Sequence, residues 1–280
     1  MNDYEKRGYL NQDYRIFHIT DQSQREFPHH YHDFYKILIL LKGDVTYCIE
    51  GKSYPLLPYD IVLISAGEVH HPIVRSSTPY ERIILYISPN FLSSFRAEGC
   101  DLELCFLRAQ QEKSNVLRLP SIQSSRLYQA LMELEGSVTE KSYGAEFYRK
   151  LLFLEFMVHL NRAAVLDTLH FMPNNNANDK ILMVLSYMNE HLTEKISIDS
   201  LSKQFYISKY YLMHSFKKET GYTIGAYLHL KRLFYGRELI RQGMPVTKAC
   251  FACGFSSYSA FSRAYKKQFG EAPTHPQGLP

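Results

Sequence analysis

The last hundred residues of the chain contain a degenerate internal repeat, and this feature restricts the fold more than any other. Two segments of this region match at a constant offset of 49 residues. Each begins with a serine, Ser208 or Ser257, whose side chain can accept a hydrogen bond from a free N–H at a helix start. Each ends at a glycine, Gly221 or Gly270, as helix C-termini often do. Since another short helix is expected before each copy, the repeat predicts two helix-turn-helix modules.

The repeated helices combine an apolar face with a polar one. Leu212 and Phe216, like Phe261 and Tyr265, are four residues apart and can pack on a partner helix. The opposite faces carry cations, hydroxyls and hydrogen-bonding groups, which anchor phosphates and read base edges in a major groove. We therefore expect double-stranded DNA to contact Lys209, Tyr210, Met213, His214 and Lys217 from the first helix, and Ser256, Tyr258, Ser259, Ser262, Arg263 and Lys266 from the second.

The distribution of charge agrees with this expectation. Residues 178–280 contain 14 Lys and Arg against 7 Asp and Glu, whereas residues 1–177 contain 18 against 21. A basic segment joined to a slightly acidic one is typical of a DNA-binding module attached to a domain with another task.

Over roughly residues 181–275 the chain resembles the AraC/XylS family of transcription regulators. The resemblance implies a transcription regulator whose matching helix positions face the DNA groove. Three positions depart from the family pattern: Gly236 stands where Ala is usual, Ala249 replaces a larger aliphatic residue and Cys250 replaces Ala. A glycine inside a helix weakens it by about 1 kcal/mol. The residues that carry the resemblance are Leu201-Ser202, Ser208, Leu212, Phe216 to Gly221, Tyr227-Leu228, Arg232, Glu238 to Ile240, Gly254 to Ser256, Phe261 to Arg263, Lys266 to Gly270 and Ala272-Pro273.

The five cysteines are few, odd in number and scattered. This usage is typical of a reducing compartment, and the N-terminus lacks the apolar core of a signal peptide, so we expect a cytoplasmic protein with no membrane segment. Cys250-x-x-Cys253 has no second Cys or His pair nearby to complete a zinc site. We expect both cysteines to lie in the core of the second module.

Residues 14–90 are rich in β-branched and aromatic residues that alternate with polar ones. Turn signals separate candidate strands at 15–19, 35–41, 45–50, 61–65 and 82–87. Many short strands at regular spacing favour a small β-barrel. Over about residues 10–95 this region resembles the cupin sensor domain found in many AraC-family proteins. The matching residues are His30-x-His32, Gly43, Gly51, Pro58-x-Asp60, Gly67 and His70.

The histidines of this region are candidates for a ligand-binding pocket. Cupin enzymes hold a metal through a similar His-x-His pair, a Glu and a later His, but the Glu position here is Lys36. Because a cation beside the site opposes metal binding, we expect no metal, no cofactor and no catalytic residue. We expect His30, His32, His70 and Arg82 to bind a small polar effector. A vestigial cluster at the barrel mouth is the remaining alternative.

Two helices are expected after the barrel, at 121–139 and 143–164. The second is apolar on most sides, so it either lies wholly in a core or also forms a subunit interface. We expect a homodimer held by Phe147, Leu151, Leu154 and Val158. The asparagine-rich stretch after Pro173 predicts a linker. The predicted organisation is an α+β chain with a cupin-like barrel at 1–105, a helical dimerisation segment at 106–170, a linker at 171–180 and an all-α double helix-turn-helix domain at 181–280.

The sequence is compatible with three functions. The first is a ligand-responsive AraC/XylS-type regulator, with DNA, a small-molecule effector and RNA polymerase as partners. The second is a regulator controlled by protein partners, with the barrel used only for assembly. The third is a metal-dependent cupin enzyme with an accessory domain. Lys36, and the absence of any Ser/His/Asp, phosphate-loop or paired-carboxylate motif, disfavour the enzyme.

Overall fold

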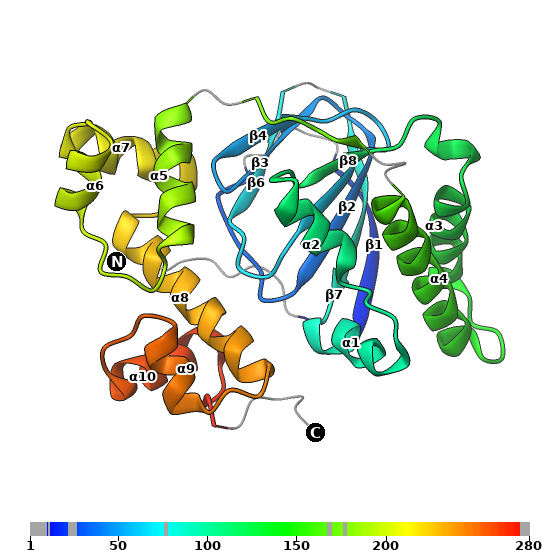
Figure 1. The fold of residues 1–280 in the computed structure, drawn as a ribbon. Helices are drawn as coiled ribbons and strands as arrows, with labels where there is room; N and C mark the ends of the chain where they lie inside the picture. Colours follow the sequence, from blue (N-terminus) through cyan, green and yellow to red (C-terminus); the bar gives the residue numbers. More distant parts are fainter. Residues whose placement is uncertain are drawn as a thin grey trace.

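The computed structural model describes residues 10, 12–21, 27–75, 78–166, 170–175 and 178–274. Its β-strands form the middle of the molecule, with α3 and α4 on one side and helices α5 to α10 on the other (Figure 1). The predicted α+β organisation, a β-rich N-terminal domain followed by an all-α C-terminal domain, is confirmed. No helix in the described ranges has the length and apolar character needed to cross a membrane.

The strands pair into two sheets. One has the order β1-β7-β2-β5-β8-β9 and the other the order β4-β3-β6. The predicted barrel is thus two sheets that face each other and are not joined into one closed ring. The strands are β1 (Tyr14–Asp21), β2 (Tyr35–Lys42), β3 (Val45–Ile49), β4 (Lys52–Pro55), β5 (Ile61–Ile64), β6 (His70–Val74), β7 (Tyr80–Ile87), β8 (Val116–Arg118) and β9 (His170–Phe171).

The side chains of strand β2 point alternately into two different hydrophobic cores. Leu38 and Leu40 point between the sheets, where they pack with Tyr47 and Tyr54 of the smaller sheet. Ile37 and Ile39 point the other way and pack with the helices that cover the larger sheet. Because both faces are buried, the strand reads as a continuous apolar run. Every side chain of β2 before Leu41 therefore has a defined place, either inside the barrel or under the helices.

The helices of the N-terminal domain cover the outer face of the larger sheet. The main ones pack on one another and share a single core with the sheet. Strand β9 follows the last of these helices and rejoins the sheet beside β8. The helical segment is therefore continuous with the barrel core. These elements are α1 (Pro89–Ser94), η1 (Phe95–Glu98), α2 (Leu104–Gln111), η2 (Ile122–Ser124), α3 (Arg126–Gly136), η3 (Ser137–Thr139) and α4 (Ala145–Val165).

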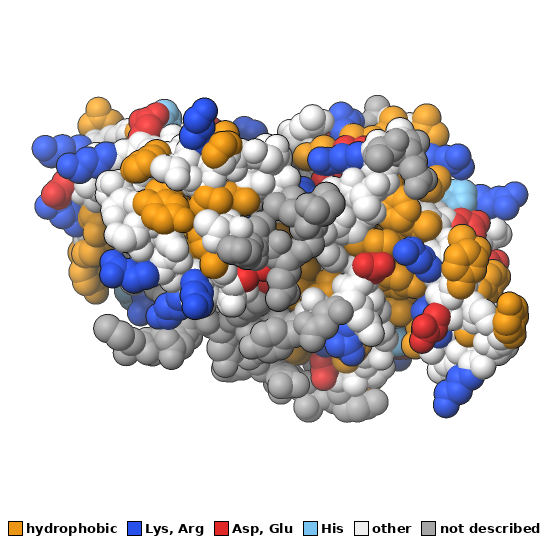
Figure 2. Space-filling view, turned by 90° about the horizontal axis from the view of Figure 1, so that it is seen from below, with side chains coloured by type: hydrophobic (Ala, Val, Ile, Leu, Met, Phe, Trp, Pro, Cys, Tyr) orange, Lys and Arg blue, Asp and Glu red, His pale blue; other side chains and the backbone are white. Residues whose placement is uncertain are grey.

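The C-terminal domain contains the two predicted helix-turn-helix modules. The first consists of α6 and α7, the second of α9 and α10, and α8 runs between them. In the face shown in Figure 2, Lys and Arg side chains are spread over this helical half of the molecule. The helices are α5 (Asp179–Glu190), α6 (Ile198–Gln204), α7 (Lys209–Thr220), α8 (Ile224–Arg241), α9 (Val246–Ala252) and α10 (Tyr258–Phe269).

The ends of the two repeated helices are equivalent except for one cap. Gly221 and Gly270 adopt the left-handed conformation that ends each helix, with φ of 74° and 79°. Ser208 accepts a hydrogen bond from the Tyr211 N–H, as predicted. The same prediction for Ser257 is wrong, because its hydroxyl contacts the Ser259 hydroxyl at 3.0 Å and caps no backbone group. A short polar neighbour inside the first turn competes for the capping hydroxyl.

Candidate functional site

Helices α7 and α10 hold the place of the recognition helix in the two helix-turn-helix modules, and each buries one face and exposes the other. Leu212, Phe216, Phe261 and Tyr265 are fully buried, as the repeat predicts. The residues predicted to contact DNA lie on the opposite faces, and all of them are exposed except Ser262, which is half-buried. The exposed set comprises Lys209, Tyr210, Met213, His214, Lys217, Ser256, Tyr258, Ser259, Arg263 and Lys266.

The first recognition helix, α7, presents aromatic and apolar groups more than charge. The side chain of Tyr210 is 77% exposed and that of Met213 is 45% exposed. The rings of Tyr210 and His214 lie parallel, with centroids 6.0 Å apart. Lys209 forms an ion pair with Asp199 of α6. This surface is therefore partly apolar, and Lys217, rather than Lys209, is the lysine of the set predicted on α7 that has no ion pair with a described residue.

Helix α8 sets the spacing between the modules. It has 18 residues, which corresponds to about 27 Å of helix. Successive major-groove faces of DNA are about 34 Å apart. The length of the connecting helix is therefore of the same order as one turn of DNA.

Inside the barrel, three predicted ligand-binding histidines come together. His30, His32 and His70 are buried, and their ring centroids are 4.4 to 5.2 Å apart. Nδ1 of His30 lies 2.9 Å from the Pro28 carbonyl oxygen, and Nδ1 of His70 lies 2.9 Å from the Glu68 carbonyl oxygen. Since a carbonyl only accepts, Nδ1 of each ring carries a proton, and Nε2 is the acceptor atom of each ring in its neutral form.

Lys36 supplies a cation to this cluster. Its Nζ donates a hydrogen bond to the Tyr47 hydroxyl at 3.0 Å and lies 3.3 Å from Nε2 of His70. Burial, and then the nearby Arg82 cation, lower the pKa of Lys36 to about 7. Burial and then Lys36 hold the pKa of His70 well below its usual range, so that His70 is neutral.

The same geometry does not fit a metal well. The three histidines could place ligand atoms within 4.8 Å of one another, a spacing that one ion could bridge. The lone pair of His70 Nε2, however, already faces the Lys36 Nζ. A metal there would have to displace an ammonium group and would meet no carboxylate ligand in the cluster.

The fourth predicted ligand residue, Arg82, also points into the barrel. Ile84 and Tyr86, which alternate with it on β7, belong to the core between the sheets. Its Nη1 lies 2.7 Å from an Asp21 carboxylate oxygen and 2.9 Å from the Tyr80 carbonyl oxygen. The guanidinium also lies 4.0 Å from the centroid of the Tyr80 ring. The charge of Arg82 is therefore balanced within the chain.

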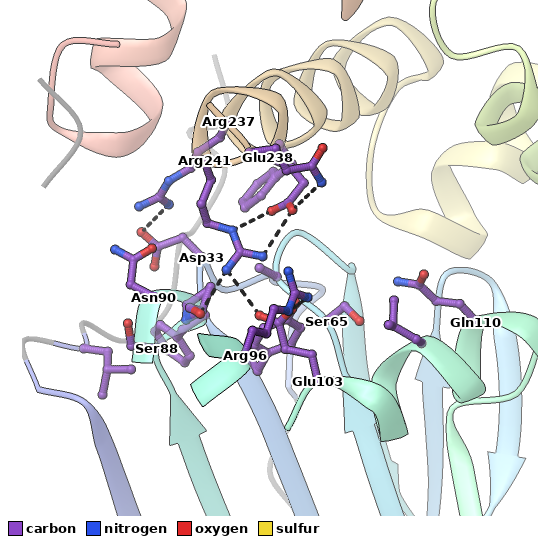
Figure 3. Close-up of a pocket in the computed structure, with 18 residues that line it drawn as sticks. Asp33, Ser65, Ser88, Asn90, Arg96, Glu103, Gln110, Arg237, Glu238 and Arg241 are labelled. Carbon is purple, nitrogen blue, oxygen red and sulfur yellow. Dashed lines mark hydrogen bonds and ion pairs between the residues drawn. The ribbon is translucent and has the colours of Figure 1, made fainter. Parts of the chain in front are cut away.

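A cavity of about 470 Å³ lies between the barrel and α8 (Figure 3). Arg241 of α8 points into it and contacts both Glu103 and Glu238, at 3.2 and 2.9 Å. Arg237, one turn earlier on α8, points toward Asp33, 3.7 Å away. Every Arg, Asp and Glu side chain that lines this cavity takes part in an ion pair, so the cavity is crossed by a network that joins the two domains.

One face of α8 is the docking surface for the barrel. Lys231 lies 2.7 Å from a carboxylate oxygen of Glu50, a third pair beside Arg237–Asp33 and Arg241–Glu103. We call these three contacts the α8 ion pairs. A second cavity, of about 690 Å³, lies beside Lys231 between the barrel and α5. Sequence reasoning missed this surface, and its signal in the sequence is the set of basic residues Lys231, Arg237 and Arg241 on a single helix.

The predicted dimer helix, α4, keeps part of its apolar surface exposed. Phe147 is 68% exposed and Leu151 is 48% exposed, while Leu154 and Val158 are half-buried. The opposite side, which includes Phe153 and Phe156, is fully buried in the core of the domain. An exposed apolar stripe on a helix anchored in this way can serve as an interaction surface.

A two-sheet sensor domain joined to two helix-turn-helix modules defines a class of DNA-binding regulators. Comparison with family models gives the same division: residues 14–157 match an AraC-like ligand binding domain, and residues 201–277 match a helix-turn-helix domain. The chain belongs to the AraC family of transcription regulators.

Among similar proteins is the HTH-type transcriptional activator RhaS of Shigella sonnei strain Ss046. The two are 23% identical over 254 residues, which cover 89% of this chain and 87% of RhaS. A solved structure of unsaturated fatty acid bound ToxT from Vibrio cholerae strain SCE256 aligns over 96% of each chain, with 16% identity and a TM-score of 0.40. The DNA-binding domain of AdpA, solved with a target DNA, aligns over 35% of this chain and 88% of its own, with 24% identity and a TM-score of 0.33.

Proposed function

We propose that this AraC-family regulator binds a specific DNA site through both helix-turn-helix modules and changes transcription when a small molecule enters its barrel. The observation that carries the proposal is that one chain exposes two similar helix faces, on α7 and α10, and also buries a cluster of polar side chains inside the barrel. The exposed faces of these helices support binding to DNA. The buried histidines inside the barrel support control by a ligand.

Within this proposal the site residues keep the roles expected from the sequence. Tyr210, Met213 and His214 read bases from α7, while Tyr258, Ser259 and Arg263 read bases from α10. His30, His32, His70 and Arg82 line the effector site. The exposed stripe of α4 holds a homodimer together, which doubles the number of recognition helices on one operator. The boundaries 1–105, 106–170, 171–180 and 181–280 are part of the same proposal.

The regulatory outcome we propose is activation. Several relatives similar over most of their length carry the name of a transcriptional activator. An activator of this kind contacts RNA polymerase when it is bound beside a promoter. We propose no enzymatic reaction for the chain. A metal-dependent cupin enzyme would hold its metal at the histidine cluster, where Nζ of Lys36 lies against Nε2 of His70.

Selection of bound sequences from random DNA with the purified full chain tests the first half of the proposal. The expected result is one motif with two parts spaced by about one helical turn. A pool that shows no enriched motif would contradict sequence-specific binding. The second half is tested by repeating the binding titration with each compound that raises the melting temperature, since a regulatory ligand must bind two states unequally. Unchanged DNA affinity and unchanged transcription in vitro with every such compound would contradict effector control.

A further inference from the structure

The turn of the first helix-turn-helix module holds a tyrosine in a backbone conformation that favours glycine. Tyr206, between α6 and α7, has a φ of 53°. A left-handed φ brings the Cβ atom close to the carbonyl oxygen, so the conformation costs free energy for every residue except glycine. The side chain of Tyr206 is 92% exposed. This position therefore combines backbone strain with an aromatic ring left in water.

The corresponding position in the second module is a glycine. The N–H of Tyr206 bonds to the carbonyl three residues earlier, and the N–H of Ile207 bonds to the carbonyl five residues earlier. Gly254 and Phe255 repeat both bonds, and Gly254 has a φ of 91°. The two turns thus share one helix-ending motif, in which glycine is the usual residue. The first module has a tyrosine in its place.

Packing within the chain does not account for Tyr206. A second tyrosine with a left-handed backbone, Tyr59, is half-buried, and its ring centroid lies 5.6 Å from that of Tyr128. Within the ranges that the structure describes, no hydrogen bond, ion pair or ring contact involves the Tyr206 side chain. The neighbouring Ile207 instead fills the core of the module. A strained residue whose ring packs on nothing is a candidate for contact with another molecule.

The position of Tyr206 in the module indicates which molecule it meets. It lies two residues before Ser208, which caps the start of α7. Helices α6 and α7 lie side by side at the end of the molecule away from α3 and α4 (Figure 1). In such a module the start of the second helix enters the major groove while the first helix crosses the sugar-phosphate backbone. The turn between them therefore lies at the edge of the groove, beside the phosphates.

We propose that Tyr206 is a phosphate-contacting residue whose hydroxyl donates a hydrogen bond to the DNA backbone beside the groove that α7 enters. The inference rests on the proposed DNA-binding function and adds a residue outside the two predicted recognition faces. A tyrosine hydroxyl is one of the side-chain donors that bind phosphate oxygens, and Lys209 at the start of α7 is already paired with Asp199. Phosphate contacts fix the position of a protein on the duplex without reading its sequence. Tyr206 thus orients α7 and raises affinity for every DNA sequence.

Binding titrations with the full chain, on the selected motif and on random DNA, test the contact. Tyr206→Phe removes only the hydroxyl and should weaken binding to both DNAs by about 10-fold, because a hydrogen bond to a charged group is lost. The slope of log affinity against log salt concentration should stay unchanged, since a neutral donor releases no counterion. Unchanged affinity for both DNAs, or a loss confined to the selected motif, would overturn the proposal.

The variant Tyr206→Gly tests the argument from strain. It should melt at a higher temperature than the original chain, because the left-handed conformation suits glycine, and it should bind DNA no more tightly than Tyr206→Phe. A lower melting temperature would show that the ring supports the fold and would contradict the proposal. Tyr143→Phe, at a fully exposed tyrosine before α4, is the matched control and should leave DNA affinity unchanged. Far-UV circular dichroism checks the folding of each variant.

The outcomes separate this inference from the function on which it rests. If the original chain selects a motif and the Tyr206 variants bind it as tightly, specific DNA binding stands and the phosphate contact is wrong. If the original chain binds DNA without sequence preference and the variants bind more weakly, the contact stands and specific recognition fails. If the variants keep their DNA affinity and lose only transcription in vitro, Tyr206 contacts a protein partner and the proposal is wrong.

Discussion

Arg241, the last residue of α8, lies 3.2 Å from Glu103 of the N-terminal domain, and the contact joins the sensor to the helix between the two DNA-binding modules. Glu103 is almost fully buried, and Arg96 contacts it from the other side. Burial raises the pKa of Glu103, while Arg241 and Arg96 act to lower it. The contact is therefore a direct link between the barrel and the helix that joins the two modules.

A double-mutant cycle measures the strength of this contact. Arg241→Met and Glu103→Gln, alone and together, should give a coupling free energy of about 1 to 3 kcal/mol in urea unfolding, because the pair is shielded from water. The control is the exposed pair Lys209–Asp199, for which the same cycle should give a clearly smaller coupling because solvent screens the pair. Equal coupling in the two cycles would contradict a special role for the α8 ion pairs.

The structure explains why position 236 is a glycine, which the sequence alone did not reveal. A Cβ atom at this position would lie 2.9 Å from Cε2 of Phe261 and 3.0 Å from Sγ of Cys253. Gly236→Ala should therefore destabilise the chain by about 1 to 3 kcal/mol through overpacking, despite the higher helix propensity of alanine.

Gly225 of the same helix is the matched control for that substitution. A Cβ atom there has no heavy atom within 4 Å. Gly225→Ala should thus leave stability unchanged or raise it by up to about 1 kcal/mol. Thermal unfolding of both variants checks the pair of predictions, and a stabilised Gly236→Ala chain would show that α8 can move away from Phe261.

The fold was largely predictable where local patterns act alone. The repeat located α7 and α10 and their glycine ends, and the alternating stretches located β2, β3 and β5 to within a residue or two. Strands β4, β6, β8 and β9 were missed. All four are short, and β4 and β6 contain proline. Strands β6, β8 and β9 also pair with segments far away in the chain, which local patterns do not reveal.

The site was predictable in its residue types but not in its charge balance. His30 and His70 could be grouped from a family pattern, whereas the pairing of Arg82 with Asp21 depends on the path of β1 beside β7. Lys36 was considered only as a residue that opposes a metal. Its lowered pKa depends on its burial and on the nearby Arg82, and a sequence gives neither.

Arg263 provides the sharpest test of DNA reading. An arginine can bind O6 and N7 of guanine together, so Arg263→Ala should cost about 1 to 3 kcal/mol at the selected motif and relax specificity at one base pair. Lys267→Ala, on the same exposed helix, is the control and should leave that specificity unchanged. An equal loss on random DNA, measured by footprinting, would exclude base reading by Arg263.

Two lysines are predicted to contact phosphates. Lys217→Ala or Lys266→Ala should weaken binding on every sequence alike. Each should also reduce the slope of log affinity against log salt concentration by about one unit, because one fewer counterion is released. A slope unchanged from that of the original chain would exclude the contact.

The exposed stripe of α4 predicts the oligomeric state. Leu151→Glu combined with Leu154→Glu would place charges of the same sign in the proposed dimer interface, where burial makes them costly. Sedimentation should then report folded monomers. Leu57→Glu, at a comparably exposed leucine of the barrel, is the control and should leave the dimer intact. A double variant that sediments as a dimer of unchanged affinity would place the interface elsewhere.

Lys36 also predicts how stability depends on pH. Its pKa is lowered from 10.5 to about 7 by burial and then by Arg82, so between these values the unfolded chain binds a proton that the folded chain does not. Stability should therefore rise with pH across this window, by up to about 1.4 kcal/mol per pH unit from this group. The penalty is fully present below pH 7 and is lost as pH approaches 10.5.

The contribution of Lys36 to this pH dependence is the difference in stability between the original chain and a variant without the lysine. The groups in contact with it titrate outside most of this window, since burial raises the pKa of Tyr47 well above 10 and lowers that of His70 well below 6.5. Lys36→Met should be more stable than the original chain near pH 6, and its advantage should shrink steadily as pH rises to about 9.5. Urea unfolding at a series of pH values measures the difference. A difference that stays constant with pH would mean that Lys36 keeps its proton throughout, as it would with a counter-charge already beside it.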